Sequence, residues 1–299
     1  MKMSKVLEVF YGSMVTVKSP GTIQWYKKIL SQVCDYLNDP EIDQIDLVDL
    51  ELYRGTLSRK SKAPGKPHNV SNWTIHGHCR AIKRFFNWAK KRKYITYNPA
   101  EDLEKPPLPK QPRKGISEKE KKIMIQTAMS NQRDYAILCF VADTGCRAAG
   151  IYNLLKSDLD LDHYKAVVRE KGQGNQKQRT VFYTTETAYA IEIYLRYNPS
   201  KSDHVFCRWD GKPLTYSGVY QIFRSIALKA GVESGWNPHN WRHAAIRGWL
   251  LAGMNLKSAS EIAGHTSEKV TADIYGTLNE IELQMIYNEI QARHNQGDS

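Results

Sequence analysis

The sequence predicts a mainly α-helical protein with one small β-hairpin or sheet, divided into two domains. Apolar residues recur at helical spacing through most of the chain, and the pattern changes to strand-like runs only around residues 164–183. A proline-rich run near residue 106 interrupts the helical pattern. With 299 residues, the chain is long enough for roughly two domains that each bury a core.

The first part of the chain, residues 1–103, is expected to be a small all-helical module. Ser19 and Pro20 are residue types that favour the N-cap and the first helical position, and apolar residues follow them at helical spacing. Further helices are expected over roughly residues 46–57 and from near Ser71 onward. The helix from Ser71 also carries a basic face, formed by Arg80, Lys83 and Arg84.

Residues 104–116 form the predicted linker. Four prolines in this run exclude a helix and favour an extended, semi-stiff backbone. The linker also has a cationic surface, to which Lys110, Arg113 and Lys114 contribute.

The remainder, residues 117–299, is the predicted second domain and ends in a tail helix. Ser117 and Glu120 have the spacing of a capping box, so a helix is expected to begin there. Two strands are expected over residues 164–170 and 179–183, joined by a loop that contains glycine, and helices return after them. This alternation predicts a mixed α/β domain.

Composition indicates a polyanionic partner and a reducing compartment. The net charge is +12, from 43 Lys and Arg against 31 Asp and Glu, which favours nucleic acid as the partner. The five cysteines are odd in number and lack a Cys-x-x-Cys pair, so we expect buried free thiols. No stretch has the length and apolarity of a membrane span or a signal core, and we expect a cytoplasmic, nucleoid-associated protein with no membrane partner.

An ordered set of residues in the second domain predicts cleavage of a DNA phosphodiester. Two guanidiniums can hold the non-bridging oxygens of a phosphate, a lysine can protonate the departing sugar oxygen, and histidines can accept the proton of a tyrosine nucleophile. None of these steps needs a metal or another cofactor. The candidate catalytic residues are Arg147, Lys171, His239, Arg242, His265 and Tyr275, with Lys177 or Arg179 as alternative acids.

Local patterns place several of these side chains. Asn237 and Pro238 predict a helix N-terminus, from which His239 and Arg242 project three residues apart. Gly264 is a predicted helix C-cap, which places the following residue, His265, on a turn.

With these motifs in this order, the chain resembles the tyrosine recombinase, or phage integrase, family over most of its length. The resemblance implies a SAM-like core-binding domain, a catalytic domain, a 3′-phosphotyrosyl intermediate at Tyr275 and strand exchange through a Holliday junction. It also implies a homotetramer that joins two DNA sites. Because the chain begins almost directly in the core-binding module, it looks closer to two-domain members, such as Xer-type recombinases and simple mobile-element integrases.

One position departs from the family pattern. Members usually have an acidic residue three positions after the first arginine, where this chain has Gly150. The substitution implies either reduced activity or support of Arg147 from another carboxylate, for which Asp143 is the candidate.

Two other functions use a similar scaffold. A type IB topoisomerase would relax supercoils by the same chemistry, and a catalytically silent DNA-binding factor would fit the loss of the acidic residue. An apolar stripe in the tail could dock into a neighbouring protomer, as in recombinases, or pack onto its own domain; it consists of Leu283, Ile286, Tyr287 and Ile290. Metal sites are disfavoured, both at His76 and His78 and at His239 and His243, because further ligands or a zincin-type Glu are missing.

Overall fold

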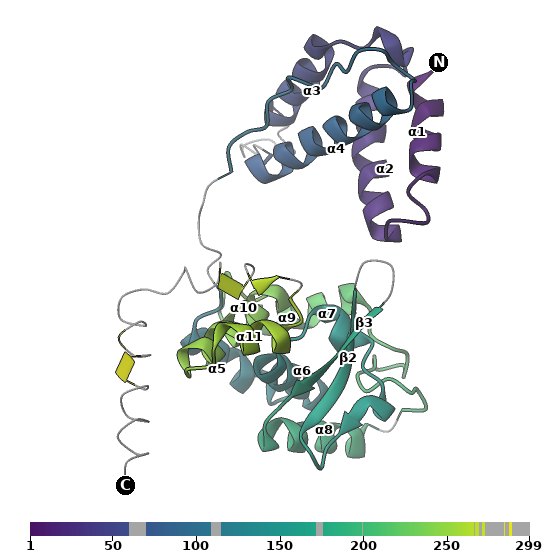
Figure 1. Ribbon diagram of the computed structural model, residues 1–299. Helices are drawn as coiled ribbons and strands as arrows, with labels where there is room; N and C mark the ends of the chain where they lie inside the picture. The colour runs from purple at the N-terminus through teal and green to yellow at the C-terminus, as the bar shows by residue number, and fades with distance from the viewer. Residues whose placement is uncertain are drawn as a thin grey trace. The chain divides into compact units, whose positions relative to one another are not determined.

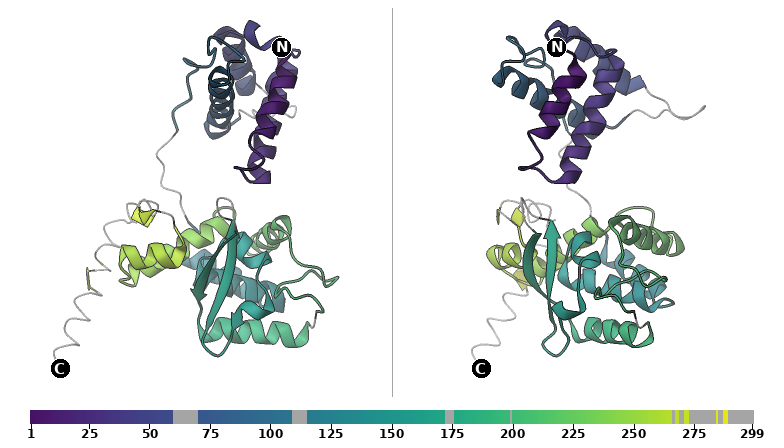
Figure 2. Two further views of the ribbon diagram at one scale, coloured as in Figure 1. Left: turned by 45° about the vertical axis from the view of Figure 1, so that its right-hand side comes forward. Right: turned by 90° about the vertical axis from the view of Figure 1, so that its right-hand side faces the viewer.

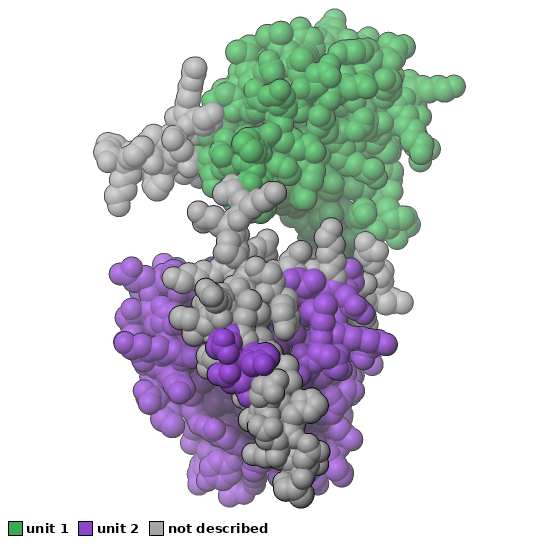
Figure 3. All heavy atoms as spheres, turned by 60° about the vertical axis from the view of Figure 1, so that its left-hand side comes forward, with its two compact units in different colours: residues 1–111 green, residues 112–299 purple. Residues whose placement is uncertain are grey.

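The computed structural model of the chain describes residues 1–59, 70–108, 115–171, 176–198 and 200–265, together with positions 267, 268, 271, 272, 284, 287 and 288. The chain separates into two compact units, Met1–Gln111 and Pro112–Ser299 (Figure 3). Helices predominate in both, and the strands of the described residues lie in the second unit (Figure 1). This confirms the predicted mainly α fold with a small sheet; the finer division at residues 103 and 117 stays a prediction.

The N-terminal unit is helical, as its sequence pattern predicts. The Ser19 and Ser71 hydroxyls accept hydrogen bonds from the N–H groups of Thr22 and Thr74, which confirms the predicted N-cap at Ser19 and the helix start near Ser71. The elements of its described part are α1 (Met3–Gly12), α2 (Pro20–Tyr36), a 3₁₀ helix (Ile42–Gln44), α3 (Leu47–Arg59) and α4 (Asn72–Lys91).

Helix α1 was not predicted from the sequence, and neither was the short 3₁₀ helix. The apolar residues of α1, spaced three or four apart, are buried against α2 and α4. Phe10 illustrates the packing: its ring centroid lies 5.4 Å from that of Phe85 and 5.1 Å from that of Trp88, both in edge-on arrangements. The three helices therefore share one aromatic core.

In the C-terminal unit, helices pack against a small sheet. The predicted capping box is present, because Ser117 and Glu120 each accept the other's backbone N–H, and Asn237 caps the N-terminus of α10. The helices are α5 (Glu118–Ala128), α6 (Gln132–Thr144), α7 (Ala148–Tyr152), a 3₁₀ helix (Lys156–Asp158), α8 (Thr185–Tyr197), α9 (Tyr216–Lys229), α10 (Pro238–Leu251) and α11 (Leu256–Ala263). Helix α6 packs against α8 and α10, and α10 against α11 (Figure 2).

The sheet is antiparallel, in the order β1 (Leu159–Asp160), β2 (Lys165–Lys171), β3 (Gln176–Phe182). Side chains alternate along a strand, so Ala166, Val168 and Glu170 lie on the same face of β2, and all three are buried. Val168 pairs with Arg179 on β3. In this register Glu170 of β2 and Arg179 of β3 both point into the interior, where β2 contacts α7.

All five cysteines are buried and free, as predicted. No helix in the described part of the chain combines the length and apolarity that a membrane crossing requires.

Candidate active site

The turn between α6 and α7 positions the first candidate, Arg147. Helix α6 ends at Gly145 in the left-handed conformation, with φ of 53°, and a Cβ there would lie 3.2 Å from the Trp249 ring. Arg147 is the N-cap of α7, and its backbone N–H donates to Oε1 of Glu170 at 2.7 Å. Glycine is thus required where the chain reverses, and the reversal directs Arg147 toward β2.

Glu170 is the buried centre of the site and is 2 % exposed. Its carboxylate forms an ion pair with the Arg147 guanidinium, and its Oε1 lies 3.1 Å from Nη2 of Arg179 and 4.0 Å from Nη1 of Arg242. Burial alone would raise the pKa of this carboxyl, but the charge of Arg179, the amide of Arg147 and the charge of Arg242 outweigh burial and lower the pKa. Glu170 is therefore an anion held among three cations.

Arg242 joins the two segments that flank the site. Its Nη1 donates to the carbonyl oxygen of Gly145 at 2.7 Å, and its Nη2 donates to the carbonyl oxygen of Ala263 at the end of α11. Burial, followed by the charge of Arg147, lowers the pKa of Arg242 to about 9, so the guanidinium stays protonated at pH 7. One buried arginine thereby fixes both the turn that bears Arg147 and the turn that bears His265.

Arg179 has a structural position that the sequence did not reveal. Its Nη1 donates to the Ile262 carbonyl while its Nη2 pairs with Glu170, and its side chain is 8 % exposed. Gly264 has φ of +67°, and a Cβ there would lie 2.7 Å from Cδ of Arg179. The predicted C-cap glycine is therefore confirmed, and Arg179 is committed to buried partners, which disfavours it as the alternative acid.

His265 follows this C-cap and sits among the cations. Its Nδ1 lies 2.7 Å from the hydroxyl of the buried Thr271. Burial, and then the charges of Arg242 and Arg147, lower the pKa of His265 to about 4. The imidazole is therefore neutral at pH 7, where it can donate one N–H to a phosphate oxygen or accept a proton.

His239 lies at the N-terminus of α10, as the cap residues Asn237 and Pro238 predict. Its Nε2 is 3.1 Å from Nε2 of His243, one helical turn later. At this separation one Nε2 donates its N–H in a hydrogen bond and the other accepts it, so the tautomers of the two histidines are linked. His243 is a neighbour that sequence reasoning considered only as a metal ligand.

The structure thus brings together Arg147, Arg242 and His265, and it places His239 on the same helix as Arg242. The backbone of Lys171 ends β2, paired with Gln176, but its side chain lies outside the described residues. The nucleophile candidate Tyr275 and the linker cations also lie outside them; these are Lys110, Arg113 and Lys114.

The expected support from Asp143 is wrong. Its carboxylate accepts hydrogen bonds from the amide and hydroxyl of Thr184, at 2.8 and 2.7 Å, and from the hydroxyl of Thr187 at 2.7 Å. Asp143 therefore stabilises the start of α8, and the carboxylate beside Arg147 belongs to Glu170.

The basic face of α4 in the N-terminal unit has a different character. The Arg80 guanidinium lies 5.1 Å from the centre of the Trp25 ring, Lys83 donates to the Leu103 carbonyl at 3.0 Å, and Arg84 is exposed. His78 of this helix faces the core, where its Nδ1 lies 2.9 Å from the Tyr53 hydroxyl.

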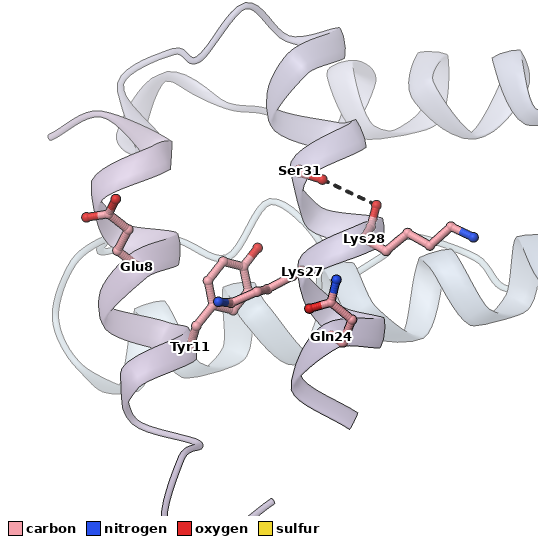
Figure 4. A pocket seen from close by; sticks show the side chains of 6 residues that line it. All are labelled: Glu8, Tyr11, Gln24, Lys27, Lys28 and Ser31. Atoms are coloured by element: carbon pink, nitrogen blue, oxygen red, sulfur yellow. Dashed lines mark hydrogen bonds between the residues drawn. The ribbon is translucent and has the colours of Figure 1, made fainter. Parts of the chain in front are cut away.

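The same unit has a shallow surface pocket between α1 and α2 (Figure 4). Lys27 extends over the Tyr11 ring, with Nζ 5.5 Å from its centre, and Ser31 donates to the Lys28 carbonyl. The pocket belongs to the N-terminal unit alone and shares no residue with the arginine cluster.

Comparison with known proteins identifies the fold and its family. Residues 115–281 match the phage integrase family, and residues 5–105 match the phage integrase SAM-like domain. The chain belongs to the phage integrase family. It is a tyrosine recombinase, an enzyme of the class that cleaves and rejoins DNA.

Relatives within the family match more than nine tenths of the chain. The tyrosine recombinase XerD of Staphylococcus epidermidis is 23% identical over 97% of this chain and 100% of its own, and XerD of Haemophilus influenzae is 26% identical over 92% and 93%. The integrase of transposon Tn1549, solved in complex with transposon right end DNA, has a TM-score of 0.75 at 18% identity and covers 100% of both chains. At that identity the structural likeness shows the fold.

Proposed function

We propose that this recombinase cleaves double-stranded DNA at a specific site by attack of Tyr275 on a phosphodiester, leaving a 3′-phosphotyrosyl bond. The observation that carries the proposal is the convergence of Arg147, Arg242 and His265 from three distant segments onto one charged centre. Guanidiniums and a neutral imidazole are the donors that a phosphate in transfer requires.

Each residue would then carry one part of the reaction. Arg147 and Arg242 hold the non-bridging oxygens, His265 donates a hydrogen bond to them, and His239 accepts the tyrosine proton. As the Tyr275 oxygen bonds to phosphorus, the bond from phosphorus to the 5′ oxygen breaks and Lys171 protonates that oxygen. The phosphotyrosyl bond conserves the energy of the phosphodiester, so rejoining needs no nucleotide cofactor.

DNA binding and assembly complete the proposal. Residues 1–103 would contact DNA through Arg80, Lys83 and Arg84, and the linker 104–116 through its own cations. The solved DNA complex of the transposon integrase supports DNA as the partner. Synapsis would use a homotetramer on two sites, coupled by the tail, in which Tyr287 is 58% exposed.

The free, buried state of all five thiols supports action on DNA in the reducing cytoplasm.

Trapping of the covalent intermediate tests the nucleophile. A library of nicked duplexes with randomised sequence is incubated with the wild-type protein, and adducts that survive denaturation are sequenced to define the cleaved site. Tyr275→Phe should bind that site with unchanged affinity and form no adduct, because only the nucleophilic oxygen is lost. Tyr197→Phe, which alters an exposed tyrosine at the end of α8 and outside the tail, should form the adduct at the wild-type rate. An adduct that persists in Tyr275→Phe would show that another residue attacks.

A further inference from the structure

Glu170 has no role in the predicted catalytic set, yet it is the residue that the site is built around. It is a carboxylate on the apolar face of β2, following the buried Ala166 and Val168 at period two. A buried anion costs several kcal/mol unless cations and hydrogen-bond donors compensate for it. Its presence on that face calls for a specific reason.

Both carboxylate oxygens of Glu170 contact Arg147. Oε1 accepts the Arg147 backbone N–H at 2.7 Å, and Oε2 pairs with the Arg147 guanidinium. The same carboxylate therefore fixes both the backbone and the charged end of one residue. The Arg147 side chain is 39% exposed, so its guanidinium is held by Glu170 and still accessible to a ligand.

The neighbouring Gly150 leaves the volume that Glu170 occupies. A Cβ on Gly150 would lie 3.5 Å from Oε1 of Glu170, 3.1 Å from Cβ of Cys146 and 3.3 Å from Cβ of Val168. An acidic side chain at position 150 and the side chain of Glu170 would compete for one space. The absence of a side chain at Gly150, the departure from the family pattern, thus leaves room for the carboxylate of Glu170.

We propose that Glu170 is the positioning residue for Arg147, and that it supplies from β2 the carboxylate that other family members supply from the position of Gly150. The inference rests on the proposed cleavage reaction. Glu170 does not touch the DNA phosphate; it fixes the direction in which Arg147 presents its N–H donors. Arg179 pairs with Oε1 at 3.1 Å and Arg242 lies 4.0 Å from the same oxygen, and these two charges help to keep Glu170 in place.

Glu170→Gln tests the role of the charge, because it keeps the shape of the side chain. Single-turnover cleavage of the selected DNA site should slow by about 10²-fold, the cost of misplacing a reacting group by about 1 Å. A second substrate carries a methylphosphonate at the cleaved position, which replaces a charged non-bridging oxygen with a neutral methyl group. Because this substrate demands less from the arginines, Glu170→Gln should slow its cleavage by less than about 10-fold.

Asp158→Asn is the matched control. Asp158 is a carboxylate of the same unit whose side chain is 8 % exposed and pairs with Arg169, outside the arginine cluster. Asp158→Asn should lower the melting temperature about as much as Glu170→Gln does. It should leave cleavage of both substrates at the wild-type rate.

Two results would overturn the inference while leaving the proposed function intact. One is cleavage by Glu170→Gln at a rate close to that of the wild type. The other is an equal loss on both substrates, which would mean that Glu170 only stabilises the fold. Absence of an adduct with the wild-type protein itself would instead overturn the proposed function, and the inference with it.

Discussion

The arginines at the candidate active site and those on α4 carry the same charge in opposite surroundings. Arg179 and Arg242 have side chains that are 8% and 2% exposed, and each donates to a backbone carbonyl as well as facing Glu170. Arg84 on α4 is exposed, and Arg80 lies over the Trp25 ring. The buried pair is therefore fixed by folding, whereas the α4 cations rest on one surface of a helix.

This difference separates two uses of positive charge. A buried guanidinium with several partners keeps one orientation, so it can meet the charge that develops on one phosphate without rearrangement. Exposed cations attract the phosphates of the DNA backbone nearly independently of one another, and salt weakens this attraction. On the proposed function, the C-terminal unit would carry out chemistry at one phosphate, and the N-terminal unit would add affinity through contacts with many.

Loss of Arg242 should have the largest effect. Arg242→Ala removes two hydrogen bonds to carbonyl oxygens and one cation near Glu170. The unfolding free energy should fall by about 3–5 kcal/mol, as when a buried ion pair is broken, and cleavage should slow by at least about 10³-fold. Denaturant unfolding and single-turnover cleavage measure the two effects.

Arg196→Ala is its control, because this exposed arginine pairs with Glu192 one turn away on α8. Its unfolding free energy should change by less than about 0.5 kcal/mol. Similar losses in the two variants would contradict the distinction between buried and exposed arginines.

The pH dependence of stability should sharpen the comparison. The pKa of His265 is about 4 in the folded chain, against about 6.5 when unfolded. Between these two pH values the unfolded state binds more protons than the folded state, so the unfolding free energy should fall as the pH drops from about 6.5 to 4. The slope should stay below about 1.4 kcal/mol per pH unit, because His265 is only half-buried. The lowered pKa of Glu170 adds a further loss at more acidic pH.

Thermal unfolding across this pH range provides the measurement. His265→Gln should flatten the curve between pH 6.5 and 4, since glutamine does not titrate. A variant whose curve keeps the full wild-type slope would assign the acid sensitivity to another group.

The smallest effect is expected on α4. Arg84→Ala should weaken DNA binding alike for all sequences and reduce the slope of log affinity against log salt by about 1. Cleavage at saturating DNA should stay at the wild-type rate, because this exposed side chain belongs to the other unit. A changed rate at saturation would mean that Arg84 takes part in more than affinity.

Much of the fold followed from local sequence signals. The N-caps Ser19, Ser71, Ser117 and Asn237 each act within one turn, so the sequence alone reveals them. Helix α1 was missed because no cap residue marks its start: Lys2 makes no capping hydrogen bond through its side chain. The two-residue strand β1 exists only through its pairing with β2, which no local pattern announces.

The site could be predicted as a set of residues but not as a network. Motif order selected Arg147, Arg242 and His265, which the structure brings together. The candidate partner of Arg147 was Asp143, which is nearer in sequence than Glu170. Glu170 is 23 positions away and meets Arg147 only through the register of β2. One signal was available: Glu170 continues the face of Ala166 and Val168, and a carboxylate on an apolar face needs a buried cation.

A double-mutant cycle on Arg147 and Glu170 tests the central claim most directly. The rate of covalent adduct formation is measured for the wild type, Glu170→Gln, Arg147→Ala and the double variant on the selected DNA site. If Glu170 acts through Arg147, Glu170→Gln should slow the wild type by about 10²-fold and slow Arg147→Ala by less than about threefold further. An equal loss in both backgrounds would show that the two residues act independently and would contradict the account.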